Sequence, residues 1–92
     1  MYTSPHNFLF ILENTVDVGA FRKTVGRRIK VRRVELGLKQ SELGTAIGVA
    51  QAQISEWEIG RRMLKLEQAV DLAKTLQTSV DYLVGATESR AG

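Results

Sequence analysis

The sequence contains no cysteine, one histidine and one proline among its 92 residues. Without cysteine, neither a disulfide framework nor a thiolate-ligated metal site can form, which is typical of proteins in a reducing compartment. The longest apolar run, Phe8–Leu12, is far shorter than the roughly 20 residues that cross a bilayer. It also lacks the basic lead-in and the cleavage site of a secretory signal. These absences predict a cytoplasmic protein without a membrane segment.

Catalytic chemistry also has few candidates in this sequence. No nucleophile paired with a base, metal-binding cluster or glycine-rich phosphate loop can be assembled from it, and His6 has no second ligand beside it. We therefore expect no enzyme activity, no metal and no cofactor. No small-molecule ligand is expected either, because no ligand-binding domain follows residue 85.

Positive charge is concentrated in the middle of the chain. The net charge of the whole sequence is +3, and residues 25–62 carry eight basic and four acidic side chains. A basic surface by itself is common on soluble helices. Beside a motif that can enter a DNA groove, however, it favours a nucleic-acid partner.

Residues 40–60 show two short helical patterns joined by a turn. The first pattern covers 40–47 and the second 51–59, and each places apolar residues on one side of a helix. These apolar residues are Leu43, Ala46 and Ile47 in the first pattern and Ile54 and Trp57 in the second. Gly48 stands where the first helix must end in a left-handed residue. Gly44 lies one turn earlier, where two crossing helices need close approach, so the segment predicts a helix-turn-helix.

Three further helices are predicted from apolar spacing and end signals. One begins at Val18 or Val25 and is stopped by Gly37, and the others cover residues 66–76 and 80–84. The apolar face of the first helix consists of Val25, Ile29 and Leu36, with Val34 at its edge. In helix 66–76 the face consists of Leu66, Ala69, Val70, Ala73 and Leu76, and in helix 80–84 it consists of Val80, Leu83 and Val84. Ser79 can cap the last helix and Gly85 can end it.

The chain divides into an N-terminal extension (1–24), a helix-turn-helix domain (25–85) and a polar tail (86–92) that is expected to be disordered. The sequence of the extension is compatible with either a helix or a short strand. Ser4 and Pro5 favour a helix start, whereas Phe8–Leu12 is rich in strand-favouring residues. Such an apolar patch is expected either to fold onto the domain or to meet a partner copy.

The motif resembles the helix-turn-helix of the lambda repressor-like family, the Cro/CI or XRE type of phage and bacterial regulators. The residues that carry the resemblance are Gln40, Leu43, Gly44, Gly48, Val49, Ile54 and Trp57, and it extends through residues 25–36 and 66–85. It implies an all-α, five-helix domain with an extra N-terminal segment. It also implies a sequence-specific transcriptional regulator, more often a repressor, that binds a palindromic operator in double-stranded DNA as a homodimer.

The resemblance also assigns candidate roles on DNA. Gln51 and Ala52 fall on base-contacting positions, and Gln53 and Glu56 fall on positions that contact or flank the bases, although both can also be plain surface residues. Gln40 falls on the glutamine that contacts the DNA backbone and braces the second helix. The phosphate contacts that we choose, because they flank both ends of the motif, are Arg28, Lys39, Arg61 and Arg62.

Two departures from the family pattern concern helix caps. Ala50 replaces the usual serine or threonine before the second helix, and Leu64 and Lys65 replace the usual proline and capping hydroxyl before helix 66–76. Each missing cap is expected to cost about 1 kcal/mol of stability. We therefore expect the fold to survive, with a lower affinity for DNA than in a typical member.

The resemblance further pairs Arg33 with Glu58 across the core. A dimer is expected because one helix contacts too few base pairs to select a site in a genome. We expect the dimer contact to involve Tyr82 or Val84, or the Phe8–Leu12 segment.

The alternative function is a protein-interaction module, antitoxin-like or coactivator-like, that keeps the helix-turn-helix without binding DNA. The apolar N-terminal segment is its best support. Salt separates the two alternatives, because DNA binding weakens steeply with salt whereas an apolar interface hardly responds.

Overall fold

The computed structural model describes residues 17–91, which fold into five helices with no strand among them. The helices are α2 (Val18–Glu35), α3 (Gln40–Ile47), α4 (Gln51–Glu58), α5 (Leu66–Thr75) and α6 (Val80–Leu83). The all-α class predicted from the sequence is confirmed. None of the described helices combines the length and the hydropathy needed to cross a bilayer. The alternatives for Ser4, Pro5 and Phe8–Leu12 lie outside the described residues.

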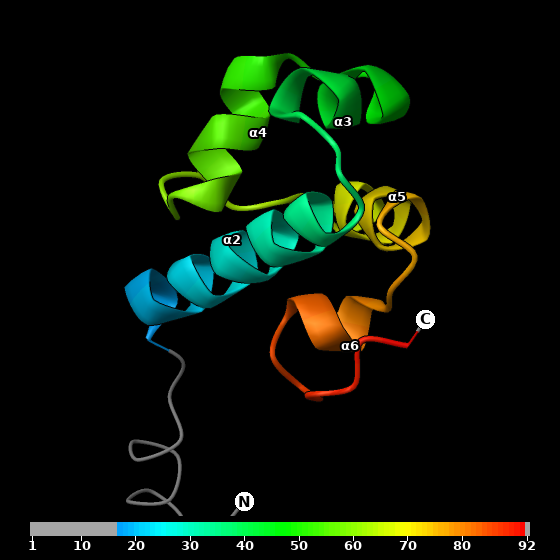
Figure 1. Cartoon of the computed structure of the whole chain (residues 1–92). Coiled ribbons are helices and arrows are strands. Elements are labelled where there is room, and N and C mark those ends of the chain that lie inside the picture. The colour runs from blue at the N-terminus through cyan, green and yellow to red at the C-terminus, as the bar shows by residue number, and fades with distance from the viewer. Residues whose placement is uncertain (1–16, 92) are drawn as a thin grey trace, which may run out of the picture.

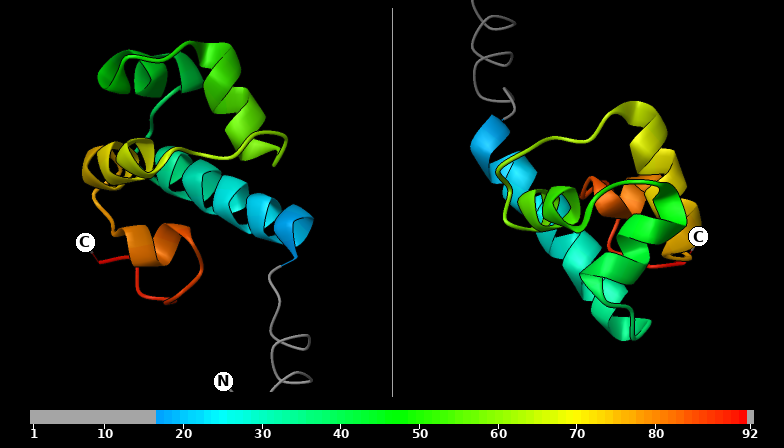
Figure 2. Two further views of the ribbon diagram at one scale, coloured as in Figure 1. Left: turned by 180° about the vertical axis from the view of Figure 1, so that it is seen from behind. Right: turned by 90° about the horizontal axis from the view of Figure 1, so that it is seen from above.

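The longest helix, α2, runs through the middle of the molecule, and the shorter helices pack around it (Figure 1). Helix α4 crosses α2 on one side and carries α3 with it, whereas α6 contacts α2 on the other side. Helix α5 joins the two groups because it contacts both α3 and α6. The views from behind and from above show that α3 and α4 together form one end of the molecule (Figure 2). This end presents the helix-turn-helix away from α6.

Side-chain caps fix the starts of the first and last described helices. Asp17 Oδ1 accepts a hydrogen bond from the Ala20 N–H at 3.0 Å, so α2 begins at Val18, the earlier of the two predicted starts. Residues 18–24 therefore belong to α2 rather than to a separate extension. At the other end, Ser79 Oγ accepts from the Tyr82 N–H at 3.0 Å, which confirms the predicted cap of α6.

The turn between α3 and α4 depends on two glycines. Gly48 ends α3 with φ 75°, the left-handed conformation predicted from the sequence. A β carbon on Gly44 would lie 2.6 Å from the carbonyl oxygen of Val49. The close approach predicted at Gly44 is therefore present, and it is made to the backbone of the turn itself.

A second close approach, at Gly26, was not predicted. Gly26 is buried in α2 where this helix crosses the end of α4, and a β carbon there would lie 2.6 Å from the Glu58 carbonyl oxygen and against the Trp57 carbonyl oxygen. Because these neighbours are backbone atoms, no rotamer change can make room for a side chain. Gly26 therefore sets the distance between α2 and α4.

All five helices contribute to one hydrophobic core. Its buried members are Val25, Ile29, Leu43, Ile54, Trp57, Leu72, Ala73, Leu76, Tyr82 and Leu83. Trp57 is in the core, as the apolar spacing predicted, and its indole N–H has no hydrogen-bond partner among residues 17–91. Helices α2 and α4 meet at this tryptophan, so the core directly supports the helix-turn-helix.

Three residues assigned to the core from their spacing are exposed instead. On α5 the buried stripe is centred on Ala69, Leu72 and Ala73, which leaves Leu66 and Val70 at its edge with 76% and 38% exposure. On α3, Gly44 rather than Ala46 faces the turn, and Ala46 is exposed. The predicted faces were wrong at these positions because spacing gives the period of a stripe more reliably than its centre.

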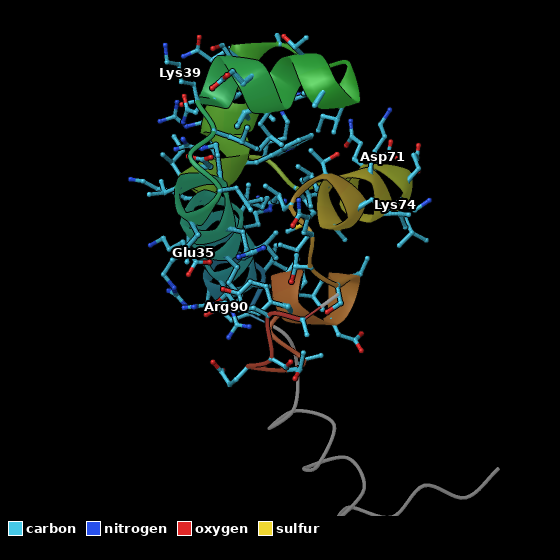
Figure 3. All side chains as sticks on the ribbon, turned by 45° about the vertical axis from the view of Figure 1, so that its right-hand side comes forward. Glu35, Lys39, Asp71, Lys74 and Arg90 are labelled. Atoms are coloured by element: carbon cyan, nitrogen blue, oxygen red, sulfur yellow. The ribbon has the colours of Figure 1, made fainter. Side chains whose placement is uncertain are left out.

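The tail was expected to be disordered, and this expectation is not met for residues 86–91. The Arg28 guanidinium donates to the Thr87 carbonyl oxygen at 2.7 Å, and the Thr78 hydroxyl donates to the Arg90 carbonyl oxygen at 2.8 Å. Figure 3 shows Arg90 beside Glu35 of α2, and their ion pair measures 2.8 Å. Residues 86–91 contain neither helix nor strand, and side chains from the helical domain hold them in place.

Candidate nucleic-acid interface

Helix α4 exposes one face at the end of the molecule that it forms with α3 (Figures 1 and 2). One side of α4 is buried through Ile54, Trp57 and Glu58, so the opposite side of the helix faces solvent. Gln51 and Ala52 are exposed, and Gln53 and Glu56 are partly exposed. The structure therefore leaves all four candidate base-contacting residues accessible on α4.

Ser55 is a further candidate that the sequence analysis missed. It lies three residues after Ala52 and one before Glu56, and it is partly exposed. In a helix, residues three and four apart share a face, so Ser55 extends the polar surface that begins at Gln51. Its spacing from Gln51 was the available signal, and a serine hydroxyl can hydrogen-bond to bases or phosphates.

A chain of polar side chains connects the start of α4 to the core. Gln51 Nε2 donates to Gln40 Oε1 at 3.5 Å, the long limit of a hydrogen bond, and Gln40 Nε2 donates to Glu58 Oε1 at 3.0 Å. Gln40 thus links the first residue of α4 to the last one. This contact agrees with the bracing role expected for Gln40.

The expected pair of Arg33 and Glu58 is present and anchors this chain. Arg33 Nε lies 2.6 Å from Glu58 Oε2, Arg33 Nη2 lies 3.0 Å from Glu58 Oε1, and the two side chains are 12% and 2% exposed. Arg33 Nη1 also donates to the Leu38 carbonyl oxygen at 2.7 Å. The hydrogen bond to Glu58 raises the pKa of Arg33 against the opposing effect of burial. Arg33 is therefore a charged donor to the Glu58 carboxylate.

Basic side chains lie at both ends of the helix-turn-helix. Lys39 precedes α3, as Figure 3 shows, and Arg61 and Arg62 follow α4; all three are exposed. Arg62 Nε lies 3.4 Å from Glu56 Oε1, so part of its charge is matched within the domain. Lys39 and Arg61 form no ion pair with other described residues.

Arg28 lies apart from this surface, and the structure does not support it as a phosphate contact. Its side chain is 11% exposed and donates to the carbonyl oxygens of Tyr82 and Thr87 at 2.9 and 2.7 Å. Its guanidinium also stacks 4.6 Å from the centre of the Tyr82 ring. Arg28 points toward α6 and the tail rather than toward α4, and we leave it out of the interface.

The same geometry affects the expected dimer contact. Tyr82 is buried beneath Arg28, so its ring cannot meet a partner copy, whereas Val84 is only partly buried. The other candidate, Phe8–Leu12, lies outside the described residues. Of the residues offered on α6 and its end, Val84 alone stays available for such a contact.

The helix ends show how the missing caps are replaced. Ala50 makes no side-chain cap, as its type implies. At α3 and α5, however, a side chain in the first turn accepts a hydrogen bond from the backbone N–H of the residue just before the helix. Glu42 accepts from Lys39 at 2.8 Å, and Gln68 accepts from Lys65 at 2.9 Å. The expected loss at Lys65 is therefore partly offset, and α4 is the helix that keeps an uncapped start.

Two short helices crossing at a left-handed glycine, with a polar face on the second, define a helix-turn-helix domain. The model of the helix-turn-helix family matches residues 29–83 of this chain, more than half of its length. The chain belongs to the lambda repressor-like, Cro/CI-type helix-turn-helix family.

Two curated relatives share this domain. The chain is 40% identical over 60 residues to repressor protein C2 of Salmonella phage P22. The match covers 65% of this chain and 28% of that protein. It is 38% identical over 64 residues to an uncharacterized transcriptional regulator in the ATPase CF(0) region of Rhodospirillum rubrum, which covers 70% of this chain and 59% of that protein. The chain thus spans less than two thirds of either relative.

Solved structures have the same fold. The clp gene regulator ClgR from Corynebacterium glutamicum matches with a TM-score of 0.66 and 27% identity, over 68% of this chain and 67% of that one. A hypothetical transcription factor, NHTF, from Neisseria matches with a TM-score of 0.67 over 75% of this chain and 79% of that one. Its 23% identity supports the fold alone.

Proposed function

We propose that this domain binds double-stranded DNA by placing α4 in the major groove, and that the protein acts in the cytoplasm as a transcriptional regulator, a repressor. The observation that carries the proposal is the position of Gln51. Its amide lies on the exposed start of α4, and Gln40, which is itself bonded to Glu58, holds it from behind. The name of the P22 relative, a repressor, agrees with this role.

The hydrogen-bonding capacity of Gln51 suits an adenine. Gln51 Nε2 uses one of its two hydrogens toward Gln40, so the second hydrogen and the carbonyl oxygen are available. A side-chain amide placed in this way can donate to N7 of adenine and accept from its N6 amino group. Ala52, next to Gln51, offers a methyl group that can contact the methyl group of a thymine.

Phosphate contacts come from Lys39 at one end of the motif and Arg61 and Arg62 at the other. These basic side chains would contact the DNA phosphates independently of sequence and thereby position α4 in the groove. Glu56 holds Arg62 at 3.4 Å and lies on the exposed face of α4. We keep Gln53 and Glu56 as proposed base contacts, with Glu56 suited to the amino group of cytosine because a carboxylate only accepts hydrogen bonds.

We further propose that two copies bind a palindromic operator. One α4 covers only a few base pairs, so two half-sites about one helical turn apart, roughly 34–36 Å, are needed for selectivity. Val84, partly exposed at the end of α6, is the described residue that stays a candidate for this contact, through the part of its side chain that faces away from α2 and α5.

Selection of binding sites from a random DNA pool tests the proposed function. The full chain should enrich a palindrome, and its affinity for the selected site should fall steeply and log-linearly with salt. A pool without an enriched sequence would overturn the proposal. A protein partner whose binding hardly changes with salt would then favour the protein-interaction module.

A further inference from the structure

An apolar groove of about 270 Å³ lies between the first half of α2, the segment 63–65, the start of α5 and α6. Its walls are formed mainly by Phe21, Val25, Met63, Leu64, Leu66 and Val84. From behind, the segment between α4 and α5 passes across α2, with α6 below (Figure 2, left). The groove is smaller than the roughly 300–1,000 Å³ of typical small-molecule sites, so it suits one or two apolar side chains.

The apolar surface continues from the groove to the very start of α2. Val18, Phe21 and Val25 are spaced three and four residues apart, so they form one stripe along the helix. Within residues 17–91 nothing covers the two ends of this surface, because Val18 is 54% and Leu66 is 76% exposed. Large exposed apolar surface of this kind marks a place where another apolar group binds.

We propose that the groove binds the Phe8–Leu12 segment of the same chain. Only four residues, 13–16, separate this segment from Asp17, where the described structure begins. Four residues span up to about 14 Å when extended, and Phe21 lies only about one helical turn, roughly 5 Å, beyond the start of α2. The segment is therefore tethered beside the groove that matches its chemistry.

A second copy of the chain fits the groove less well. A tether this short gives an effective concentration in the millimolar range, far above the concentration of a free partner. Filling a groove with one or two side chains also buries much less surface than the roughly 1,200–2,000 Å² that stable dimers bury. The same chain is therefore the occupant that the geometry favours.

Binding of the segment has a consequence for the proposed DNA contact. Met63 and Leu64, which line the groove, directly follow Arg61 and Arg62 in the sequence. A filled groove holds this stretch against α2 and α5, and thereby fixes the backbone that carries the two arginines. This consequence rests on the proposed function, whereas the docking itself does not.

A double-mutant cycle in the full chain tests the docking. Leu66→Ala should lower the folding equilibrium constant at least about fivefold, because a covered leucine is lost. The same substitution should have almost no effect in a second background in which each residue from Phe8 to Leu12 is changed to serine. Val34→Ala is the matched control, since Val34 is exposed on α2 outside the groove. It should change the constant less than twofold in both backgrounds.

Two further measurements make the result decisive. Nuclear Overhauser effects should be observed between the Leu66 methyl groups and the aromatic ring protons of Phe8 or Phe10. Neither these effects nor the coupling free energy between Leu66 and residues 8–12 in the double-mutant cycle should change when the protein is diluted. Equal effects of Leu66→Ala in both backgrounds would overturn the proposal. Coupling that disappears on dilution to the monomer would overturn it too, because the occupant would then be a second copy.

Discussion

The two sides of α2 use arginine in different ways. Toward α4, Arg33 pairs with Glu58, whose side chain is 2% exposed. Toward α6, Arg28 pairs with Glu88, whose side chain is 92% exposed, and makes its other hydrogen bonds to backbone carbonyl oxygens. The two arginines are five positions apart in the sequence, which corresponds to a rotation of about 140° around the helix. This rotation decides whether a guanidinium braces the helix-turn-helix or holds the tail.

The difference shows which contacts depend on a particular partner. Arg33 is held by a buried carboxylate, and removal of that carboxylate leaves a buried charge uncompensated. Arg28 is held mainly by carbonyl groups, which every residue supplies. We therefore expect the α4 side of α2 to be sensitive to substitution and the tail side to tolerate it.

Glu58→Ala should have the largest effect on this comparison. We expect a loss of about 3–5 kcal/mol in the free energy of unfolding, because Arg33 stays buried without its partner. Urea denaturation measures it. The double variant Arg33→Ala/Glu58→Ala should lose less than the sum of the single variants. Additive losses would mean that the two side chains do not interact in solution.

Gly26→Ala tests the same side of α2 through its backbone. The new β carbon would lie 2.6 Å from the Glu58 carbonyl oxygen, so we expect a loss of about 1–3 kcal/mol in the free energy of unfolding. Gly19→Ala is the matched control on the same helix, where the nearest atom lies at 3.5 Å. It should leave stability unchanged or raise it by up to about 1 kcal/mol, since alanine favours helix. Similar effects at both positions would contradict the close crossing of α2 and α4.

Arg61→Ala and Arg62→Ala extend the comparison to DNA. Arg61→Ala should weaken binding to all DNA sequences alike. It should also reduce the slope of the logarithm of the binding constant against the logarithm of the salt concentration by about one unit. Arg62→Ala should have a smaller effect, because Glu56 already matches part of its charge at 3.4 Å. Lys74→Ala on α5 serves as the control and should leave the slope unchanged. Equal slopes for wild type and Arg61→Ala would remove Arg61 from the interface.

Glu88→Ala should have the smallest effect. Its carboxylate is almost fully exposed, and exposed ion pairs contribute little to stability. The urea midpoint should therefore stay within experimental error of wild type. A loss comparable to that of Glu58→Ala would show that the two sides of α2 do not differ as we describe.

The sequence predicted well what local rules and side-chain pairs determine. The bounds of α3, the left-handed Gly48 and the pairing of Arg33 with Glu58 follow from end signals and from the family resemblance. Gly26 was missed because a glycine inside a helix looks the same whether or not another backbone crosses it. Only the crossing of α2 by α4 gives that residue its role.

The surroundings of Arg28, Tyr82 and Leu66 could not be predicted from the sequence, because they depend on how α5, α6 and the tail pack against α2. Arg28 was chosen for its charge, but its partners are carbonyl groups of α6 and the tail, which carry no sequence signal. The place of Tyr82 in the core and the exposure of Leu66 depend on where α5 and α6 pack, and helical spacing alone does not determine that. The base contacts on α4 stay predictions, since they depend on a partner that is not part of the chain.

The affinity of Gln51→Ala for the selected operator and its single-base-pair variants tests the central claim most directly. We predict that the substitution costs about 1–3 kcal/mol on the operator and removes the preference at one base pair, an adenine position, while all other preferences stay as in wild type. Lys74→Ala on α5, outside the interface, is the control and should leave every preference on the same panel unchanged. A uniform loss across the whole panel, or no loss at all, would contradict the claim that α4 selects the sequence through Gln51.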